Sequence, residues 1–297
     1  MNYAIQTTNL TKVYGKARGI TDVTFHVQVG EVFGFLGPNG AGKTTTIRLL
    51  LNLLKPTSGQ VSIMELDANS DSFRTRQFCG AVFSEPSFYG KLTGLENLSL
   101  LQSYHSQGKL YSRTLAERLD VDLERPVHSY SRGTRQKLAI VQALSHHPKV
   151  LILDEPTSGL DPLIQQEFYK ILMELKDAGV SIFLSSHILS EVDRLCDRVG
   201  IIKEGSLIEL KDVADLRRQQ IRRIQVILNR EVNASDFQTE GLEILNFSGR
   251  SAELLVSGEI KSLINHLNTL PIENVIFPEA SLEDTFNKFY EHPESEP

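Results

Sequence analysis

Apolar residues follow an alternating pattern through the first two thirds of the chain. Short runs that are apolar throughout alternate with segments in which apolar residues recur at helical spacing. Strands buried on both faces of a parallel sheet are apolar throughout, and helices connect them. The pattern therefore predicts an α/β domain. The expected strands are Glu31–Leu36, Cys79–Phe83, Val150–Leu153 and Val180–Leu184, with a hairpin over Val199–Leu210.

Helix boundaries can be read from capping residues between these runs. Thr93 followed by Glu96 has the spacing of a capping box, in which each side chain accepts a hydrogen bond from the other residue's amide. Asp161 is placed to cap a helix that Gly179 closes. The expected helices are Lys43–Leu54, Asp71–Gln77, one from Thr93 toward Tyr104, Lys137–Leu144 and Asp161–Lys176.

The pattern changes after a basic, polar stretch at Arg217–Arg223, which we interpret as a solvated linker. Beyond it, Ile224, Val226 and Leu228 alternate like a half-buried strand. We expect a nucleotide-handling domain over residues 1–216 and a small C-terminal α+β domain over residues 217–297. Its further elements are strands at Leu242–Phe247, Ala252–Val256 and Val275–Phe277, helices at Ile260–Leu270 and Ser281–Tyr290, and a disordered acidic tail from Glu291.

Composition narrows the class of protein. The net charge of the 297 residues is -6, which argues against a generally basic nucleic-acid footprint. Two cysteines, Cys79 and Cys196, do not make a disulfide framework, and we expect both to be buried apolar side chains. No apolar run has the length of a membrane-spanning helix, and no secretory leader opens the chain. We expect a protein of the cytoplasm.

The strongest local motif is Gly37–Thr44, which matches G-x-x-x-x-G-K-[ST] between an expected strand and an expected helix. Its glycines let backbone amides face phosphates, and the helix N-terminus adds a partial positive charge. Lys43 would reach the β- and γ-phosphates, and the Thr44 hydroxyl would bind Mg²⁺. The expected nucleotide-binding residues here are Gly37, Pro38, Asn39, Gly40, Ala41, Gly42, Lys43, Thr44 and Thr45.

A second acidic motif follows the apolar strand at Val150–Leu153. Asp154 is suited to hold Mg²⁺, directly or through water, and Glu155 to orient or deprotonate an attacking water. An apolar strand that ends in two acids is weak support by itself. It gains weight because a phosphate loop precedes it.

Four further strings resemble those of ATP-binding cassette ATPases. The Tyr130–Gln136 string resembles the family's signature loop, Ser158–Asp161 its D-loop and Ser185–His187 its switch histidine, while Tyr14 stands where an aromatic ring stacks on adenine. The resemblance covers the chain from about its third residue to the hairpin. It implies a P-loop core with a helical lobe, ATP and Mg²⁺ as cofactors, and a γ-phosphate contact from His187.

The family resemblance also implies the assembly. Two cassettes pack head to tail around two ATP molecules, so that the Lys43 loop of one subunit and Ser131 and Gly133 of the other hold the same nucleotide. Because this chain has one set of motifs, it should pair with a second copy of itself or with a paralogous cassette.

One segment departs from the family pattern. Ser84 stands at the position of the usual glutamine, with Glu85 beside it. Serine is too short to bridge Mg²⁺ and water as glutamine would, so either Glu85 replaces the missing ligand or water fills the gap. We favour Glu85 facing the groove for a membrane partner. Arg132, where glycine is usual, is a second departure.

Three functions use a phosphate loop of this kind. A switch GTPase lacks support because no N-K-x-D string is present. A cassette ATPase acting on ribosomes or DNA remains the alternative, although such proteins usually carry two cassettes or a long coiled coil. The preferred function is the ATP-hydrolysing subunit of an exporter, on the inner face of the cell membrane, with a separately encoded membrane permease. Ala280–Phe286 resembles the ending of drug, polysaccharide and peptide exporter cassettes, and Ser84–Tyr89 resembles bacteriocin- and bacitracin-type cassettes.

Overall fold

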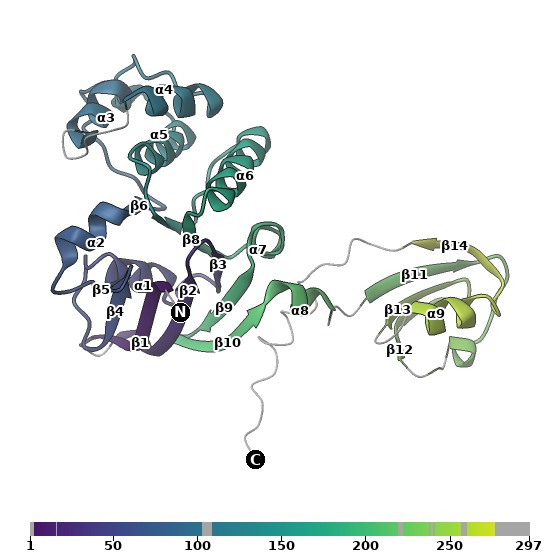
Figure 1. The fold of residues 1–297 in the computed structure, drawn as a ribbon. Coiled ribbons are helices and arrows are strands. Elements are labelled where there is room, and N and C mark those ends of the chain that lie inside the picture. The colour runs from purple at the N-terminus through teal and green to yellow at the C-terminus, as the bar shows by residue number, and fades with distance from the viewer. Residues whose placement is uncertain are drawn as a thin grey trace. The chain divides into compact units, whose positions relative to one another are not determined.

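The computed structural model describes residues 3–15, 17–102, 109–218, 222–237, 239, 241–256 and 260–276 (Figure 1). The chain divides into two compact units, Met1–Val213 and Ala214–Pro297. The division falls slightly before the boundary that the sequence predicts after residue 216. In the described part of the chain, no helix combines the length and the apolar character needed to cross a membrane.

A six-stranded sheet forms the centre of the first unit, in the order β10-β9-β3-β8-β7-β6. All neighbouring strands run parallel except β10, which pairs antiparallel with β9. The α/β prediction is confirmed, because the apolar runs form the buried strands of this sheet. The strands are β3 (Val32–Leu36), β6 (Cys79–Val82), β7 (Val150–Asp154), β8 (Ser181–Ser186), β9 (Arg198–Lys203) and β10 (Ser206–Asp212).

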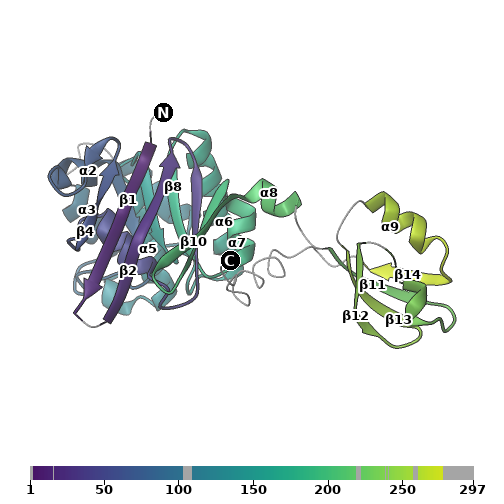
Figure 2. The ribbon, with the colours of Figure 1, turned by 90° about the horizontal axis from the view of Figure 1, so that it is seen from below.

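A second, antiparallel sheet has the order β2-β1-β4-β5, and its two long strands lie side by side in Figure 2. Its strands are β1 (Tyr3–Tyr14), β2 (Ala17–Gln28), β4 (Ser58–Ile63) and β5 (Leu66–Asp67). Phe25 of β2 packs against Phe33 of β3 and Phe183 of β8, with ring centroids 5.3 and 5.6 Å apart. Ile47 and Leu50 belong to the same buried cluster, so the two sheets and the helix that carries the phosphate loop share one core.

That helix, α1 (Lys43–Leu50), ends earlier than predicted. Asn52 adopts a left-handed backbone with φ of 52°. The amide of Leu53 donates to the carbonyl of Arg48, and the amide of Asn52 to that of Leu49. This is a Schellman motif, which satisfies the last carbonyls of a helix. The prediction that the helix reaches Leu54 is therefore wrong, and Asn52 was the sequence signal for the earlier end.

Helices α3 (Gly94–Gln102), α4 (Lys109–Arg118) and α5 (Arg132–Leu144) lie together, away from the antiparallel sheet (Figure 1). The predicted capping box begins α3, because the Thr93 amide donates to Glu96 Oε2 at 2.8 Å and the Glu96 amide donates to Thr93 Oγ1 at 3.2 Å. The remaining elements of this unit are α2 (Ser72–Phe78), α6 (Pro162–Asp177), α7 (Leu189–Leu195) and a short 3-10 helix at Val127–Ser129.

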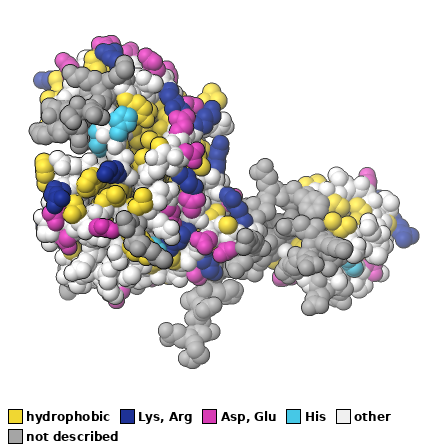
Figure 3. Space-filling view, viewed as in Figure 1, with side chains coloured by type: hydrophobic (Ala, Val, Ile, Leu, Met, Phe, Trp, Pro, Cys, Tyr) yellow, Lys and Arg dark blue, Asp and Glu magenta, His cyan; other side chains and the backbone are white. Residues whose placement is uncertain are grey.

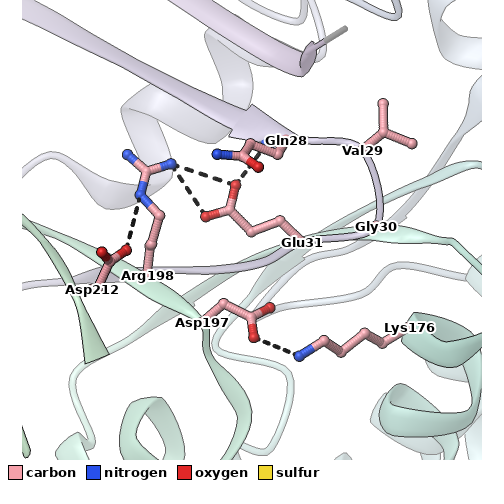
Figure 4. A pocket seen from close by; sticks show the side chains of 8 residues that line it. All are labelled: Gln28, Val29, Gly30, Glu31, Lys176, Asp197, Arg198 and Asp212. Atoms are coloured by element: carbon pink, nitrogen blue, oxygen red, sulfur yellow. Dashed lines mark hydrogen bonds and ion pairs between the residues drawn. The ribbon is translucent and has the colours of Figure 1, made fainter. Parts of the chain in front are cut away.

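Charged residues line a pocket of about 390 Å³ at the edge where β3 and β9 begin (Figure 4). Arg198 Nη1 lies 3.2 Å from Glu31 Oε1, and Lys176 Nζ lies 2.6 Å from Asp197 Oδ1. Burial raises the pKa of the Glu31 carboxyl, whereas the nearby Arg198 guanidinium opposes that rise. These side chains pair with one another and tie the ends of several strands together.

Both cysteines are free and buried, as expected. Burial raises the pKa of the Cys79 thiol to about 12 and that of the Cys196 thiol further. A thiol with such a pKa stays protonated at neutral pH, so both side chains act as small apolar groups.

The second unit contains a four-stranded antiparallel sheet of order β12-β13-β11-β14, and α9 (Ile260–Leu267) contributes Leu263 and Leu267 to the same buried cluster as the strands. Ile224, Val226 and Leu228 of β11 are buried with Phe237, which confirms the alternating strand. The elements are β11 (Arg222–Leu228), a 3-10 helix at Ala234–Phe237, β12 (Leu242–Phe247), β13 (Ser251–Val256), α9 (Ile260–Leu267) and β14 (Ile272–Ile276).

Two expectations for this region are corrected. The linker predicted over Arg217–Arg223 is too long, because α8 (Val213–Arg218) includes its first residues and Arg223 already pairs with Leu255 in the β11–β13 ladder. The helix predicted to reach Leu270 ends at Leu267, where successive tight turns replace helical hydrogen bonds. The structure does not describe residues beyond 276. Three expectations therefore lie outside the described residues: Phe277 as the last residue of a strand, the helix at Ser281–Tyr290 and the acidic tail.

Replacing the capping residue should loosen α3. We expect Thr93→Ala to lower the local stability of this helix by about 1 kcal/mol, because the Glu96 amide loses its acceptor. Amide hydrogen exchange across α3 measures the change. Thr93→Ser keeps the hydroxyl and should exchange like the parent, and equal exchange in Thr93→Ala and the parent would contradict the role of the cap.

Candidate nucleotide-binding site

Three parallel strands end at one edge of the central sheet and bring the predicted chemistry together. Leu36 of β3 pairs with Ser186 of β8, and Asp154 of β7 pairs with Ser185 of β8. The phosphate loop, Glu155 and His187 directly follow these three ends. This is the edge at which open α/β sheets bind ligands.

The phosphate loop connects β3 to the N-terminus of α1. Lys43 is only 5% exposed, and its ammonium donates to the carbonyl oxygens of Gly37 at 2.7 Å and Pro38 at 3.2 Å. Gly42 has φ of +111°, and a Cβ there would lie 2.6 Å from Ile20 Cγ2, so a side chain would not fit. The remaining predicted loop residues range from exposed (Pro38, Asn39, Gly40) through half-buried (Thr44, Thr45) to buried (Gly37, Ala41).

Two hairpins support this loop through contacts that have no signal in the sequence. The Gly205 amide in the β9–β10 turn donates to the Ala41 carbonyl at 2.9 Å, and the Thr21 amide of β2 donates to the Gly205 carbonyl at 2.8 Å. Tyr14 ends β1 on the same β1–β2 hairpin and is 40% exposed. Lys12 Nζ lies 5.6 Å from the centroid of its ring. An exposed ring on a hairpin that contacts the phosphate loop is available for stacking.

Asp154 is 1% exposed and connects the loop to the neighbouring strand. Its Oδ2 accepts a hydrogen bond from Thr44 Oγ1 at 2.9 Å, and its Oδ1 accepts one from Ser185 Oγ at 2.7 Å. A hydroxyl and a carboxylate oxygen side by side are the donor types that Mg²⁺ prefers, with the remaining positions left to water and phosphate. The residues present therefore fit a magnesium ion.

Glu155 lies between the two basic groups of the site. Its Oε1 is 3.3 Å from Lys43 Nζ and 3.2 Å from His187 Nδ1. Its backbone is left-handed with φ of 46°, and its amide donates to the Ser185 carbonyl at 3.2 Å. A strained backbone of this kind occurs where a side chain must be aimed. The contact with Lys43 was not predicted, since no sequence motif reports a pairing between these loops.

Ser131 and Gly133 lie at the start of α5, beside the D-loop, with Ser131 as the N-cap residue. Ser131 Oγ accepts from the Thr134 amide at 3.0 Å and so caps the helix. A Cβ on Gly133 would lie 2.5 Å from the Gly159 carbonyl oxygen, so the helix start packs tightly against the D-loop. Among the described residues, neither Ser131 nor Gly133 makes a hydrogen bond or ion pair with Lys43.

Ser84 and Glu85 follow β6, where Val82 pairs with Leu153 of β7. The segment therefore leaves the sheet at the same edge as Asp154. Ser84 is half-buried and Glu85 is exposed, and Tyr89 further along is 71% exposed. The two alternatives for the missing glutamine, Glu85 as a metal ligand or water beside Ser84, stay predictions.

Comparisons with known proteins agree with this geometry. A family model described as ABC transporter matches residues 20–158. The bacitracin transport ATP-binding protein of Bacillus licheniformis is 35% identical over 298 residues, which cover 97% of each chain. This chain belongs to the ABC transporter family. The lantibiotic transport ATP-binding protein of Streptococcus pyogenes is 37% identical over 207 residues, or 69% of this chain and 89% of its own.

A solved structure described as the ATP-binding subunit of an ABC transporter gives a TM-score of 0.67 at 32% identity and covers 73% of this chain and 92% of its own. The resemblance to ATP-binding cassette ATPases is therefore confirmed, as is the P-loop α/β fold. The chain is an ABC ATPase that binds ATP.

Removing the buried ammonium tests the phosphate loop. We expect Lys43→Ala to lower ATP affinity at least tenfold, because a charge-assisted hydrogen bond to phosphate contributes about 2 kcal/mol. Isothermal titration calorimetry with ATP measures the change. Lys149→Ala removes an exposed lysine and should bind like the parent. Unchanged affinity and turnover in Lys43→Ala would show that Gly37–Thr44 does not hold the phosphates.

Proposed function

We propose that this chain hydrolyses ATP to power export of a substrate through a separately encoded membrane permease. The observation that carries the proposal is the convergence of Lys43, Asp154, Glu155 and His187 at one sheet edge. The cargo class is an antibiotic, an antimicrobial peptide or a lipid-linked compound. The chain would work in the cytoplasm, on the inner face of the cell membrane.

Nucleotide binding exchanges one set of partners for another. Lys43 now contacts two carbonyl oxygens and Glu155, and a triphosphate would offer it stronger anionic acceptors. Thr44 and Asp154 would hold Mg²⁺, which neutralises charge on the phosphates. Tyr14 would stack on the adenine ring. Glu155, released from Lys43, would then be able to accept a proton from water.

Hydrolysis would use the Glu155 and His187 pair. The Glu155 carboxylate is 23% exposed and can be reached by a water molecule, which it would orient and deprotonate. His187 Nδ1 contacts the same carboxylate oxygen, and its side chain is 47% exposed. Its ring can turn toward the γ-phosphate because it lies on a loop end rather than in the core. The pair therefore supplies a general base and a phosphate contact.

The lack of any bond between Lys43 and either Ser131 or Gly133, in the part of the chain that the structure describes, supports a dimer. Each chain provides one phosphate loop and one Ser131 element, by which we mean Ser131–Gly133, with Ser131 and Arg132 exposed. A nucleotide held by the phosphate loop of one chain would therefore be left open on one side. A second copy or a paralogous cassette, placed head to tail, would cover that side. ATP would then close the dimer, and hydrolysis would open it.

The extent of similarity supports the exporter assignment and its cargo class. The alignment to the bacitracin transport protein runs through 97% of this chain, whereas the alignment to the lantibiotic transport protein covers 69%. A C-terminal accessory domain over residues 217–297 would thus be shared with the bacitracin-type proteins. The two relatives are named for the transport of bacitracin and of lantibiotics, which are both antimicrobial peptides.

The permease would dock on the segment from Ser84 to Tyr89. Tyr89 is 71% exposed and Glu85 is exposed, which suits a protein contact with an apolar centre and a polar rim. Figure 3 shows acidic and basic side chains interspersed on one face of the molecule. Interspersed charge favours a protein partner over a phosphate backbone. Glu85 would face this partner, with water beside Ser84 in the metal site.

Replacing the Glu155 carboxylate by an amide should separate ATP binding from ATP hydrolysis. We expect Glu155→Gln to bind ATP while its turnover falls about a hundredfold or more, since an amide cannot accept the proton. The ATP-bound dimer should accumulate in size-exclusion chromatography with light scattering. Glu117→Gln makes the same replacement at an exposed position of α4 and should behave like the parent. Parental turnover in Glu155→Gln, or a monomer at saturating ATP, would contradict the assignment.

A further inference from the structure

A buried carboxylate joins two loops of the site without belonging to either. Glu191 lies in the first turn of α7 and is 4% exposed. Its Oε2 accepts a hydrogen bond from Ser186 Oγ at 2.6 Å, and its Oε1 accepts one from Tyr169 OH at 3.0 Å. Thr157 Oγ1 also donates to Oε1. Three hydroxyl groups from three separate segments therefore meet at one side chain.

Two of these donors adjoin the proposed catalytic pair. Ser186 immediately precedes His187, and its hydroxyl also accepts from the Ile188 amide at 2.9 Å. Thr157 is the second residue after Glu155. Because His187 Nδ1 lies 3.2 Å from Glu155 Oε1, the contacts form a closed ring that runs from Glu155 through Thr157, Glu191 and Ser186 to His187.

The energetics of burial favour a specific role for this carboxylate. Taking a carboxylate out of water costs several kcal/mol unless hydrogen bonds compensate. Hydrogen bonds from hydroxyl groups offset the cost of burying the Glu191 carboxylate. These donors are themselves buried, since Thr157 is 5% exposed and Ser186 is 1% exposed. An apolar residue could fill the same volume at lower cost. It could not hold two loops in a fixed register.

The ring also reaches the Ser131 element. Gln136 Nε2 of α5 donates to the Pro156 carbonyl at 3.1 Å, one residue before Thr157. Arg132 Nη2 donates to Ser158 Oγ at 3.4 Å, one residue after it. A displacement of the start of α5 would therefore move Thr157. Glu191 is the side chain through which that displacement reaches Ser186.

We propose that Glu191 is a positioning residue that sets the spacing between Glu155 and His187. Through Thr157 it also makes that spacing depend on the position of the Ser131 element, which would contact the other nucleotide in the dimer. This inference rests on the proposed function. It adds a residue whose hydrogen bonds go to Thr157, Tyr169 and Ser186 rather than to the phosphate loop, and a route by which one site would sense the other.

The test compares two buried glutamates of the same unit in the full-length chain. We expect Glu191→Gln to lower kcat for ATP about tenfold, or about 1.4 kcal/mol of transition-state stabilisation, with KM within about twofold. The phosphate loop is untouched, so binding is preserved. Glu31→Gln, in the pocket of Figure 4 at the other sheet edge, should keep kcat within about twofold.

A double-variant series separates positioning from general stability. Thr157→Val and Ser186→Ala should each lower kcat, and the pair together should lose little more than the larger single loss, because either change opens the same ring. This series also serves if Glu191→Gln does not fold. Parental kcat in a folded Glu191→Gln, or in both Thr157→Val and Ser186→Ala, would overturn the inference alone. A parental chain that hydrolyses no ATP would overturn the proposed function and the inference together.

Discussion

The two hydrogen bonds to Asp154 hold the candidate site together. One oxygen of this buried carboxylate accepts from Thr44 at the start of α1, and the other accepts from Ser185 near the end of β8. A single side chain on β7 thus fixes the phosphate loop against the strand that leads to His187. Because parallel strands end at one edge, two short bonds suffice to align three loops. The positions of Lys43, Glu155 and His187 follow from this alignment.

The same geometry underlies the proposal that the site is only half of a nucleotide clamp. Ser131 begins α5 and packs beside Gly159, while Lys43 lies at the sheet edge. The phosphate loop and the Ser131 element, which we propose contacts the partner's nucleotide, therefore lie in different parts of one unit. Glu191 connects them indirectly, since it accepts hydrogen bonds from the loops after β7 and at the end of β8. In this account, opening and closing of the dimer act on hydrolysis through the Glu155 and His187 pair.

The sequence predicts the buried sheet well because parallel strands such as β3, β7 and β8 are apolar throughout. It misses β1 and β2, whose mixed polar composition and irregular register resemble neither a buried strand nor a clean alternation. The helix α4 is missed because its sequence is mostly polar and shows no clear apolar face. Motifs locate Lys43, Asp154, Glu155 and His187, but the contacts of Lys43 with Glu155 and of Gly205 with Ala41 depend on how loops fold back. Glu191 has no local signal, because its partners come from distant segments.

The central claim is that one chain completes the nucleotide site of another, and mixing two inactive variants tests it most directly. Lys43→Ala disables the phosphate loop, and Ser131→Arg places a bulky cation where the other chain's phosphates would lie. In an equal mixture, a mixed dimer keeps one intact site, so ATPase activity should recover to about a quarter of the parental rate. If the parental chain hydrolyses ATP by itself, activity in the mixture no greater than that of the separate variants would contradict the account.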